Sequence, residues 1–337
     1  MSIYNNLIRE NVAPAGAKQI SVYNQKGVRV GVIPLGTLAF PKSVERQYSF
    51  GAISDIHVVY DTAEADFRRA LNFFKDDDDI EFVCICGDLT DKGTEAELTT
   101  YKNVITGCGI SKPIYSIAGN HEHYGSTSSS FLQNYTGQPL YYTFSVGNDV
   151  FIMFGISSAT TDSVFYDGSL QWLYETLEAN RNKRCFLFEH ILCPEGSGDV
   201  KGMYPYTKLS GTEGSVFKSL LKHYKNVIFF HGHSHMKFSM QEYGMTANYD
   251  KAFGIHSVHI PSLAVPRDDV DGDWVYDTLY ADSEGYVVDV YENGIHLRGR
   301  DFVKGEFLPI ASYWLDTTLQ TIPAGTYTDS TGTINVG

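Results

Sequence analysis

The sequence predicts an α/β fold in which helices cover a sheet with parallel strands, and two observations support it. From Tyr48 onward, short apolar runs alternate with segments whose apolar residues recur every three or four positions. Several apolar runs end directly before Asp, Asn or His, as expected where the carboxyl ends of strands line one crevice. Repeated strand–helix–strand succession favours parallel strands joined by right-handed crossovers.

The first half of the chain divides into a leader and three strands with two helices. Residues 1–45 are expected to form a β-rich leader with a hairpin around Gly27. Helices are expected around an apolar stripe centred on Ala70, and from Glu95 to a stop at Gly107. The strands of this half are expected at 50–54, 82–86 and 113–118.

The second half continues the alternation and then changes character. A hairpin is expected over 141–156, and helices are expected around Leu173 and Phe217. Strands without helices between them follow, and they either extend the main sheet or pack as a second one. Strands are expected after the two helices at 185–189 and 227–230, and the later strands without helices between them are 255–260, 286–291 and 295–300. After the leader, a domain is expected over 46–310 and a tail over 311–337. Within the domain, a core that carries the motifs covers 48–237 and the C-terminal strands cover 255–301.

The composition is globular and argues against nucleic acid as the partner. The chain has 337 residues, 43% of them hydrophobic, and a formal net charge of -14. Affinity for a polyphosphate backbone comes mostly from Lys and Arg, which are scattered thinly here. Two small groups of basic residues are expected on the surface, Arg68 with Arg69 and the stretch 181–184. A small phosphorylated substrate remains compatible with the charge, since metal ions inside a site can supply positive charge.

The sequence predicts a cytoplasmic protein without a membrane partner. The stretch Met1–Ile20 is polar where a signal peptide needs an apolar run, and no apolar run approaches the roughly 18 residues of a spanning helix. The five cysteines are an odd number without Cys-x-x-Cys spacing, which favours reduced thiols. Cys84 and Cys86 are expected in the core.

Polar residues gather where the predicted strands end, and their types suit a metal centre. Each one alone also fits a turn, a helix cap or a hydrogen-bonded core position. Together they offer carboxylate, amide and imidazole donors without thiolate, which suits Mn, Fe, Zn or Ni rather than calcium. One carboxylate can bridge two such ions. The residues are Asp55, His57, Asp88, Asn120, His121, His190, His233 and His235.

These residues fall into ordered blocks that carry a family resemblance. The blocks are Asp55-Ile56-His57, Gly87-Asp88-Leu89-Thr90-Asp91, Gly119-Asn120-His121-Glu122, a lone His190, and Gly232-His233-Ser234-His235. With them, residues 48–237 resemble the calcineurin-like metallophosphoesterases, and the second block is most similar to their cyclic-nucleotide phosphodiesterase-like branch. The resemblance implies a four-layer α/β/β/α sandwich and a binuclear metal centre. It also implies hydrolysis of small phosphomonoesters or phosphodiesters by attack of a metal-bound hydroxide on phosphorus.

The resemblance further implies a role for each residue. One ion would be held by Asp55, His57 and His235, and the other by Asn120, His190 and His233. Asp88 would bridge the two ions. His121 would stay off the metals and stabilise the phosphoryl oxygens or protonate the leaving alkoxide. Asp91 or Glu122 would orient His121 or a ligand, and His231 would lie behind the ligands or in the core.

Two departures distinguish the chain from other branches of the family. Purple acid phosphatases have a Tyr ligand and a Gly where Asp91 and His57 stand here. Protein Ser/Thr phosphatases have Asp-Arg-Gly, with a phosphate-binding Arg, where this chain has Asp91-Lys92-Gly93. A tyrosinate–iron centre is therefore not expected.

Two other functions stay open at this stage. The phosphoesterase domain could serve as a binding scaffold in an assembly, or the enzyme could be a nuclease, which predicts a stripe of Lys and Arg beside the metals. Oligomeric state and metal identity are not predicted. Substrate choice is expected to depend on aromatic residues such as Tyr124 and on the loops 124–139, 158–168, 194–212 and 262–282.

Overall fold

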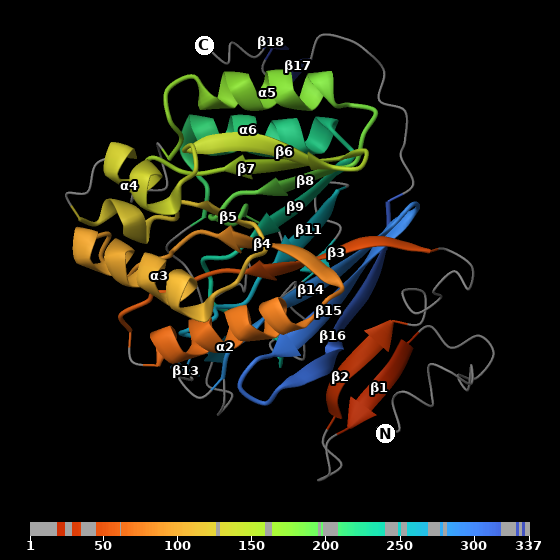
Figure 1. Cartoon of the computed structure of the whole chain (residues 1–337). Helices are drawn as coiled ribbons and strands as arrows, with labels where there is room; N and C mark the ends of the chain where they lie inside the picture. Colours follow the sequence, from red (N-terminus) through yellow and green to blue (C-terminus); the bar gives the residue numbers. More distant parts are fainter. Residues whose placement is uncertain are drawn as a thin grey trace.

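Two six-stranded sheets pack face to face, and helices cover their outer faces (Figure 1). This arrangement confirms the predicted four-layer α/β/β/α sandwich. The computed structural model describes residues 19–23, 29–34, 45–60, 62–125, 129–158, 164–194, 197, 208–239, 249–250, 255–268, 277–278, 282–317, 328–329 and 332–333. None of the helices in these ranges has the length and apolar character needed to cross a bilayer.

The first sheet contains the first three strands of the sandwich and the last three. Its order is β16-β15-β14-β3-β4-β5, with β3, β4 and β5 parallel and the other three strands antiparallel. The strands are β3 (Arg46–Ile53), β4 (Ile80–Cys86), β5 (Ile114–Ile117), β14 (Glu284–Tyr291), β15 (Gly294–Asp301) and β16 (Glu306–Asp316). Helices α2 (Ala63–Asp76) and α3 (Glu95–Cys108) cover its outer face (Figure 1). The last strand therefore runs past residue 310.

The second sheet contains the middle of the chain. Its order is β10-β11-β9-β8-β7-β6, and the four strands from β11 to β7 are parallel. The strands are β6 (Tyr141–Val146), β7 (Asp149–Phe154), β8 (Cys185–Phe188), β9 (Val227–His231), β10 (Tyr249–Asp250) and β11 (His256–His259). Helices α5 (Ser169–Ala179) and α6 (Gly211–His223) lie on its outer face (Figure 1). The late strands are thus divided between the two sheets, because β11 pairs with β9 whereas β14 pairs with β3.

The remaining elements are short. The predicted hairpin of the leader is present as an antiparallel pair, β1 (Gln19–Tyr23) with β2 (Arg29–Pro34), and β2 lies beside β16. Helix α4 (Ser129–Thr136) packs near α3, and the strand pairs β12 with β13 and β17 with β18 complete the described chain. Their bounds are Arg267–Asp268, Asp277–Thr278, Thr328–Asp329 and Gly332–Thr333.

Helix α3 ends two residues later than predicted. Gly107 lies inside the helix, and Gly109 adopts the left-handed conformation, with φ 61°, that ends it. The beginning of the helix is fixed by a capping box, in which Thr94 and Glu97 each bond the other's backbone N–H. Either glycine can follow a helix, so the sequence could not choose between them.

Alternating side chains along each central strand build three apolar layers. Phe50, Phe82 and Phe230 point between the sheets, whereas Ile53 and Ile85 point toward α2 and α3. Cys84 and Cys86 lie in the layer between the sheets, as predicted. All five cysteines are buried free thiols.

Arg184 corrects one expectation from the sequence. The stretch 181–184 was expected on the surface, but Arg184 is buried and binds Asp149 of β7 with two N–H groups, at 3.0 Å (Nε–Oδ1) and 2.5 Å (Nη2–Oδ2). Tyr48 of β3 donates to the same carboxylate at 2.6 Å. The buried pair therefore ties the two sheets together.

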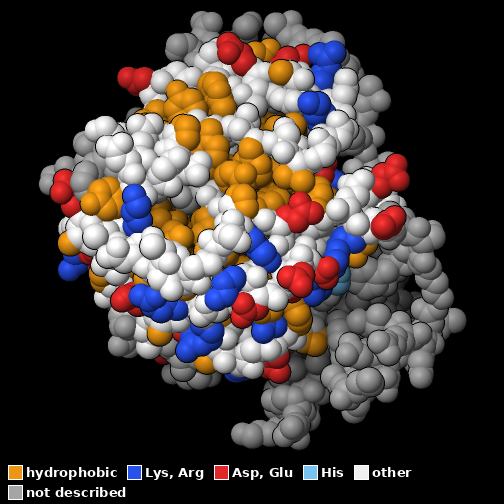
Figure 2. All heavy atoms as spheres, in the orientation of Figure 1, with side chains coloured by type: hydrophobic (Ala, Val, Ile, Leu, Met, Phe, Trp, Pro, Cys, Tyr) orange, Lys and Arg blue, Asp and Glu red, His pale blue; other side chains and the backbone are white. Residues whose placement is uncertain are grey.

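The outer surface in Figure 2 has a mixed character. Hydrophobic side chains gather around β6, and Lys and Arg side chains are interspersed with Asp and Glu. On the described part of this face the basic side chains form no continuous stripe.

Glu284 is a buried carboxyl group whose ionisation affects stability. Its Oε2 accepts a hydrogen bond from the backbone N–H of Phe238 at 2.8 Å. Burial raises the pKa of Glu284 from its ordinary 4.5 to about 7, although the nearby charge of Lys237 opposes the shift.

We expect Glu284→Gln to flatten the pH dependence of the free energy of unfolding. A carboxyl whose pKa is raised by folding contributes stability that is present below its unfolded pKa and is lost as the pH rises through its folded pKa. The wild type should therefore lose about 3 kcal/mol from this group between about pH 4.5 and 7. Gln keeps the acceptor oxygen and does not ionise. Urea unfolding at pH 5 and pH 8 measures the difference, with Glu306→Gln on the exposed end of β16 as control. Parallel profiles for the wild type and Glu284→Gln would contradict the assignment.

Candidate metal centre

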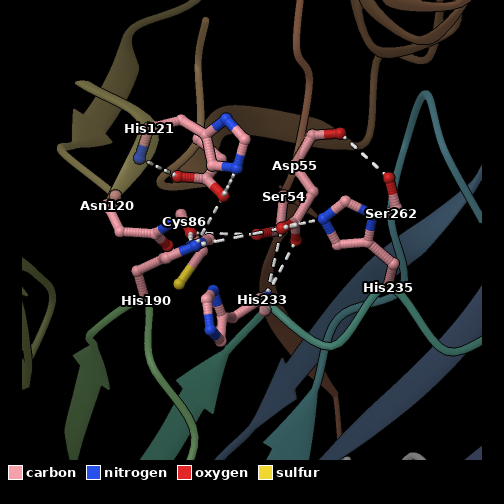
Figure 3. Close-up of polar contacts among 12 residues, drawn as sticks. Ser54, Asp55, Cys86, Asn120, His121, His190, His233, His235 and Ser262 are labelled. Atoms are coloured by element: carbon pink, nitrogen blue, oxygen red, sulfur yellow. Dashed lines mark hydrogen bonds and ion pairs between the residues drawn. The ribbon is translucent and has the colours of Figure 1, made fainter. Parts of the chain in front are cut away.

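The loops that follow the central strands of both sheets bring all of the predicted site residues together (Figure 3). Asp55 and His57 follow β3, and Asp88 follows β4. Asn120 and His121 follow β5, where His121 begins the short 3-10 helix η2 (His121–His123). His190 comes after β8, and His233 with His235 after β9. The side chains point toward one another across the edge where the sheets meet, as the strand-end argument predicted.

Three groups of donor atoms form among the described residues, and two of them share one carboxylate; the third contains His57, Asp91 and His121. The first contains Asp55, His57, Asp88 and His235, and the second contains Asp88, His190 and His233; within each, the donor atoms lie within 4.8 Å of one another. In the first, His235 Nε2 lies 3.0 Å from Asp55 Oδ1 and 3.3 Å from His57 Nε2. In the second, His190 Nε2 lies 3.0 Å from Asp88 Oδ2. Asp88 therefore stands between two places that suit a cation.

Backbone carbonyls fix the orientation of three site histidines. Since a carbonyl only accepts, the Nδ1–H of His190 donates to Cys86 O at 2.6 Å, and that of His235 donates to Val265 O at 3.1 Å. His121 donates in the same way to the carbonyl of Asp91 at 2.6 Å. Each contact leaves Nε2 facing the centre, the arrangement that supports metal-binding histidines.

Unpartnered buried atoms test whether these residues fit a metal. Among the described residues, Asp88 Oδ2, Asn120 Oδ1 and His190 Nε2 are buried and make no hydrogen bond of good geometry, although the first and the last lie 3.0 Å apart. A buried polar atom left without a partner costs about 1–3 kcal/mol. All three atoms belong to residues that the family resemblance assigns to metal binding. A bound cation would give each atom a partner, so these residues fit a metal.

The charges of the centre favour cations. Burial alone would raise the pKa of Asp55, but the nearby His235 and His190 hold it well below its usual range. The pKa of Asp88 is also held below its usual range, because His190, His121 and His57 together outweigh the effect of burial. Burial lowers the pKa of His57 to about 3, so its imidazole is neutral at pH 7. Ionised carboxylates and a neutral imidazole are the forms in which these groups bind metal.

Among the described residues other than glycine, left-handed backbone is confined to the site. Within the described ranges, the non-glycine residues with positive φ are Asp55, His57, Asp88, His233 and His235, with φ between 45° and 74°. Such conformations cost about 1–3 kcal/mol each and persist where the surrounding structure imposes them, often at functional sites. All five residues are predicted ligands.

Close packing explains the glycine that precedes Asn120. A Cβ on Gly119 would lie 2.2 Å from Asp88 Oδ1 and 2.4 Å from the Asp88 backbone nitrogen. Gly232 has a similar role, since its Cβ would lie 2.0 Å from Ser54 Oγ. Gly119 thus lets two loops of the first sheet approach each other, and Gly232 lets a loop of the second sheet approach one of the first.

We expect Gly119→Ala to weaken metal binding about 10- to 100-fold, the usual cost of disturbing the groups that support a ligand. The added methyl group forces Asp88 out of position. Titration of the metal-free protein with Mn²⁺ by calorimetry measures the change. Gly107→Ala is the control, because Gly107 lies inside α3 and its Cβ would meet only the end of the Arg68 side chain, at 3.1 Å. Equal affinities for both variants would contradict the prediction.

The three residues expected to support the ligands have different surroundings. Asp91 Oδ1 lies 3.7 Å from His57 Nδ1 and 3.8 Å from His121 Nδ1, so it stands beside both rings. Glu122 contacts no ring; it accepts hydrogen bonds from the backbone N–H groups of Thr90 and Gly119, at 2.9 and 2.7 Å, and so ties two loops together. His231 is buried as the last residue of β9, with Nε2 2.9 Å from Ser197 Oγ.

The cavity at the centre has a volume of about 190 Å³ and includes residues that sequence reasoning did not assign. Tyr124 accepts a hydrogen bond from Asn120 Nδ2 at 2.9 Å, which turns Asn120 Oδ1 toward the centre. Among the described residues that line the cavity, Arg267 has the basic side chain. Its backbone N–H donates to His235 O at 2.9 Å. Tyr124, two residues after the third block, is one of the aromatic residues that the sequence had already connected with the cleft. Arg267, together with Tyr60 and Val265, belongs to no block.

Comparisons with known proteins agree with this geometry. A family model described as calcineurin-like phosphoesterase matches residues 48–237. No curated protein sequence matches the chain. Similar solved structures include the purple acid phosphatase PPD1 from seeds of yellow lupin (Lupinus luteus), with a TM-score of 0.58 and 14% identity over 82% of this chain and 55% of that one. Vacuolar Protein Sorting 29 from Cryptosporidium parvum has a TM-score of 0.39 and 12% identity, over 81% of this chain and 100% of that one.

The lupin phosphatase shares the fold, and the chain spans about half of its length (55%). The family model covers more than half of the chain, and its range contains every predicted ligand. Five of those ligands line one cavity at the edge of the two sheets, and Asp55 and His190 share the two donor groups with them. The chain therefore belongs to the calcineurin-like phosphoesterase family.

Proposed function

We propose that the protein is a binuclear metallophosphoesterase that hydrolyses small phosphomonoesters or phosphodiesters. The observation that carries the proposal is the sharing of Asp88 between two groups of donor atoms. A single carboxylate placed in this way can bridge two cations, which typically lie about 3.5–4 Å apart in such sites.

The proposed ligands divide between the two ions as the sequence suggested. Asp55, His57 and His235 hold one ion, and the other is held by Asn120, His190 and His233, with Asp88 in contact with both. The two ions, drawn from Mn, Fe, Zn or Ni, supply Lewis acidity toward the attacking water and the phosphoryl oxygens.

His121 is the proposed proton donor to the leaving group. Its Nδ1–H is held by the carbonyl of Asp91, and its Nε2 lies 3.9 Å from Asp88 Oδ2 at the centre. Asn120 precedes it in the chain, and Asp88 Oδ1 accepts the backbone N–H of His121 at 2.9 Å. These contacts hold the imidazole beside the proposed ions, and we propose that Nε2 stays off them and delivers a proton to the departing oxygen.

The size and charge of the site favour a small substrate over a nucleic acid. The cavity of about 190 Å³ lies below the roughly 300–1,000 Å³ of pockets that enclose a drug-sized ligand. The chain carries a net charge of -14, and basic side chains on the face in Figure 2 alternate with acidic ones. A polynucleotide would need a positive surface beyond the cavity.

Metal analysis coupled to turnover tests the proposal. Metal-free protein is reconstituted with Mn, Zn, Fe or Ni and assayed with p-nitrophenyl phosphate and bis-p-nitrophenyl phosphate. We expect two ions per chain, and hydrolysis that disappears on chelation and returns with metal. A protein that binds two ions and hydrolyses neither ester contradicts the proposal. Faster cleavage of single-stranded DNA than of either ester would instead favour a nuclease.

A further inference from the structure

Four aromatic rings form a continuous run along one side of the cavity. The ring centroids of Tyr60 and His57 are 6.5 Å apart, those of His57 and His121 are 4.5 Å apart, and those of His121 and Tyr124 are 4.5 Å apart. All four residues line the cavity. We call this run the aromatic wall.

The two tyrosines at the ends of the wall reach solvent. Tyr60 is 37% exposed and Tyr124 is 53% exposed, and Val59 beside Tyr60 is 50% exposed. In the described part of the chain, the other exposed large hydrophobic side chains are Val303 and Phe307, which do not line the cavity. Exposed apolar groups gathered at one place commonly mark a binding site.

Local backbone turns explain why each tyrosine lies against a histidine. Tyr60 N–H donates to His57 O at 2.8 Å, and Tyr124 N–H donates to His121 O at 3.3 Å. Each tyrosine thus follows its histidine by three residues and is turned back beside it. The same turn occurs in the loops after β3 and β5, so the backbone of these two loops places both tyrosines in the wall.

The position of His121 determines which part of a substrate meets the wall. A cavity of about 190 Å³ is smaller than a pocket that encloses a whole ligand, so the group beyond the ester oxygen extends toward the mouth. If His121 protonates that oxygen, the group attached to it starts beside His121 and next to Tyr124. This step rests on the proposed function.

We propose that the aromatic wall selects phosphoesters whose leaving group carries a planar aromatic ring close to the ester oxygen. Such a ring packs on Tyr124 and Tyr60, and aromatic pairs gain energy beyond that of burying the same area. A saturated ring of the same size covers the tyrosines equally but lacks the planar face. The expected preference is about 3- to 10-fold per tyrosine.

Benzyl phosphate and cyclohexylmethyl phosphate provide a matched comparison, because both release a poorly acidic primary alcohol with a six-membered ring. We expect the metal-loaded wild type to prefer benzyl phosphate about 10-fold in kcat/KM. Tyr60→Ala and Tyr124→Ala should each reduce the preference by about 3- to 10-fold, mainly through KM. Phe307→Ala, which removes an exposed aromatic ring elsewhere, should leave the ratio unchanged.

Tyr124→Phe separates the ring of Tyr124 from its hydroxyl group. This variant loses the contact with Asn120 but keeps the ring. We expect it to slow both esters in parallel while preserving the preference for benzyl phosphate. If Tyr124→Phe abolished the preference, the hydroxyl group and not the ring would be responsible, and the proposal would be overturned.

Binding of non-hydrolysable phosphonates tests the wall without turnover. Calorimetry on the metal-loaded protein should show tighter binding of benzylphosphonate than of cyclohexylmethylphosphonate, and Tyr124→Ala should reduce the difference by about 3- to 10-fold. If this holds while neither ester is hydrolysed, the wall stands and the proposed function fails. If both esters are hydrolysed but the two phosphonates bind equally, the function stands and the wall is overturned. Absence of binding by both phosphonates also overturns it.

Discussion

Asp88→Asn is expected to reduce the proposed phosphoester hydrolysis by at least about 10³-fold, since the two proposed ions together would supply several kcal/mol of transition-state stabilisation. Asp88 Oδ2 is the donor atom nearest to both halves of the centre, 3.0 Å from His190 Nε2 and 3.8 Å from His57 Nε2. Asn keeps the shape of the side chain but removes the negative charge that holds two cations together. Metal content per chain should therefore fall below two.

The measurement combines metal analysis of the purified variant with turnover of p-nitrophenyl phosphate. Asp78→Asn is the matched control, because Asp78 is an exposed acid in the loop between α2 and β4 and lies outside the cavity. Circular dichroism establishes that the variant is folded. Retention of two ions and normal turnover in a folded Asp88→Asn protein would refute the bridging role.

Asp149→Ala is expected to lower the free energy of unfolding by about 3–5 kcal/mol, the cost of leaving a buried charge without its partner. Arg184 is only 4% exposed, and both of its bonds to Asp149 would be lost together with the bond from Tyr48. The remaining contacts of Arg184 to backbone oxygens, such as Tyr291 O at 2.7 Å, do not neutralise its charge.

Urea unfolding of the wild type and the variant measures this effect. Asp79→Ala is the control, because Asp79 pairs with Arg46 on the surface, where an ion pair contributes about 1 kcal/mol or less. The double variant Asp149→Leu with Arg184→Met should recover much of the loss, since it leaves no unpaired charge. A loss for Asp149→Ala no larger than that for Asp79→Ala would show that the pair has little effect on stability.

The site was more predictable from sequence than the arrangement of the sheets. Each proposed ligand comes shortly after a strand, so the order of strands and polar residues was enough to bring Asp55, Asp88 and His190 together. The late strands gave no such information. Their alternation predicts pairing without naming a partner, and only the structure shows that β11 and β14 join different sheets.

Contacts between distant segments account for what the sequence did not predict. The bond between Glu122 and Thr90 is one such contact, because nothing local in the sequence shows that Thr90 lies beside Glu122. Arg184 precedes a strand, and nothing local indicates that Asp149 lies next to it in the neighbouring strand. Arg267 reaches the cavity through backbone bonds to the loop after β9.

The left-handed conformation of the five site residues links metal binding to folding. The strain of these backbone conformations favours relaxation of the loops. A bound cation opposes that relaxation, because it needs all of its donor atoms in place at the same time. Metal-loaded protein should therefore resist denaturation by an increment that grows with the logarithm of the free metal concentration. Depletion of metal would loosen the loops at this edge before the sheets separate, because the strands beneath them are held by a core between the two sheets. Metal supply would then control how long the protein persists as well as how fast it works.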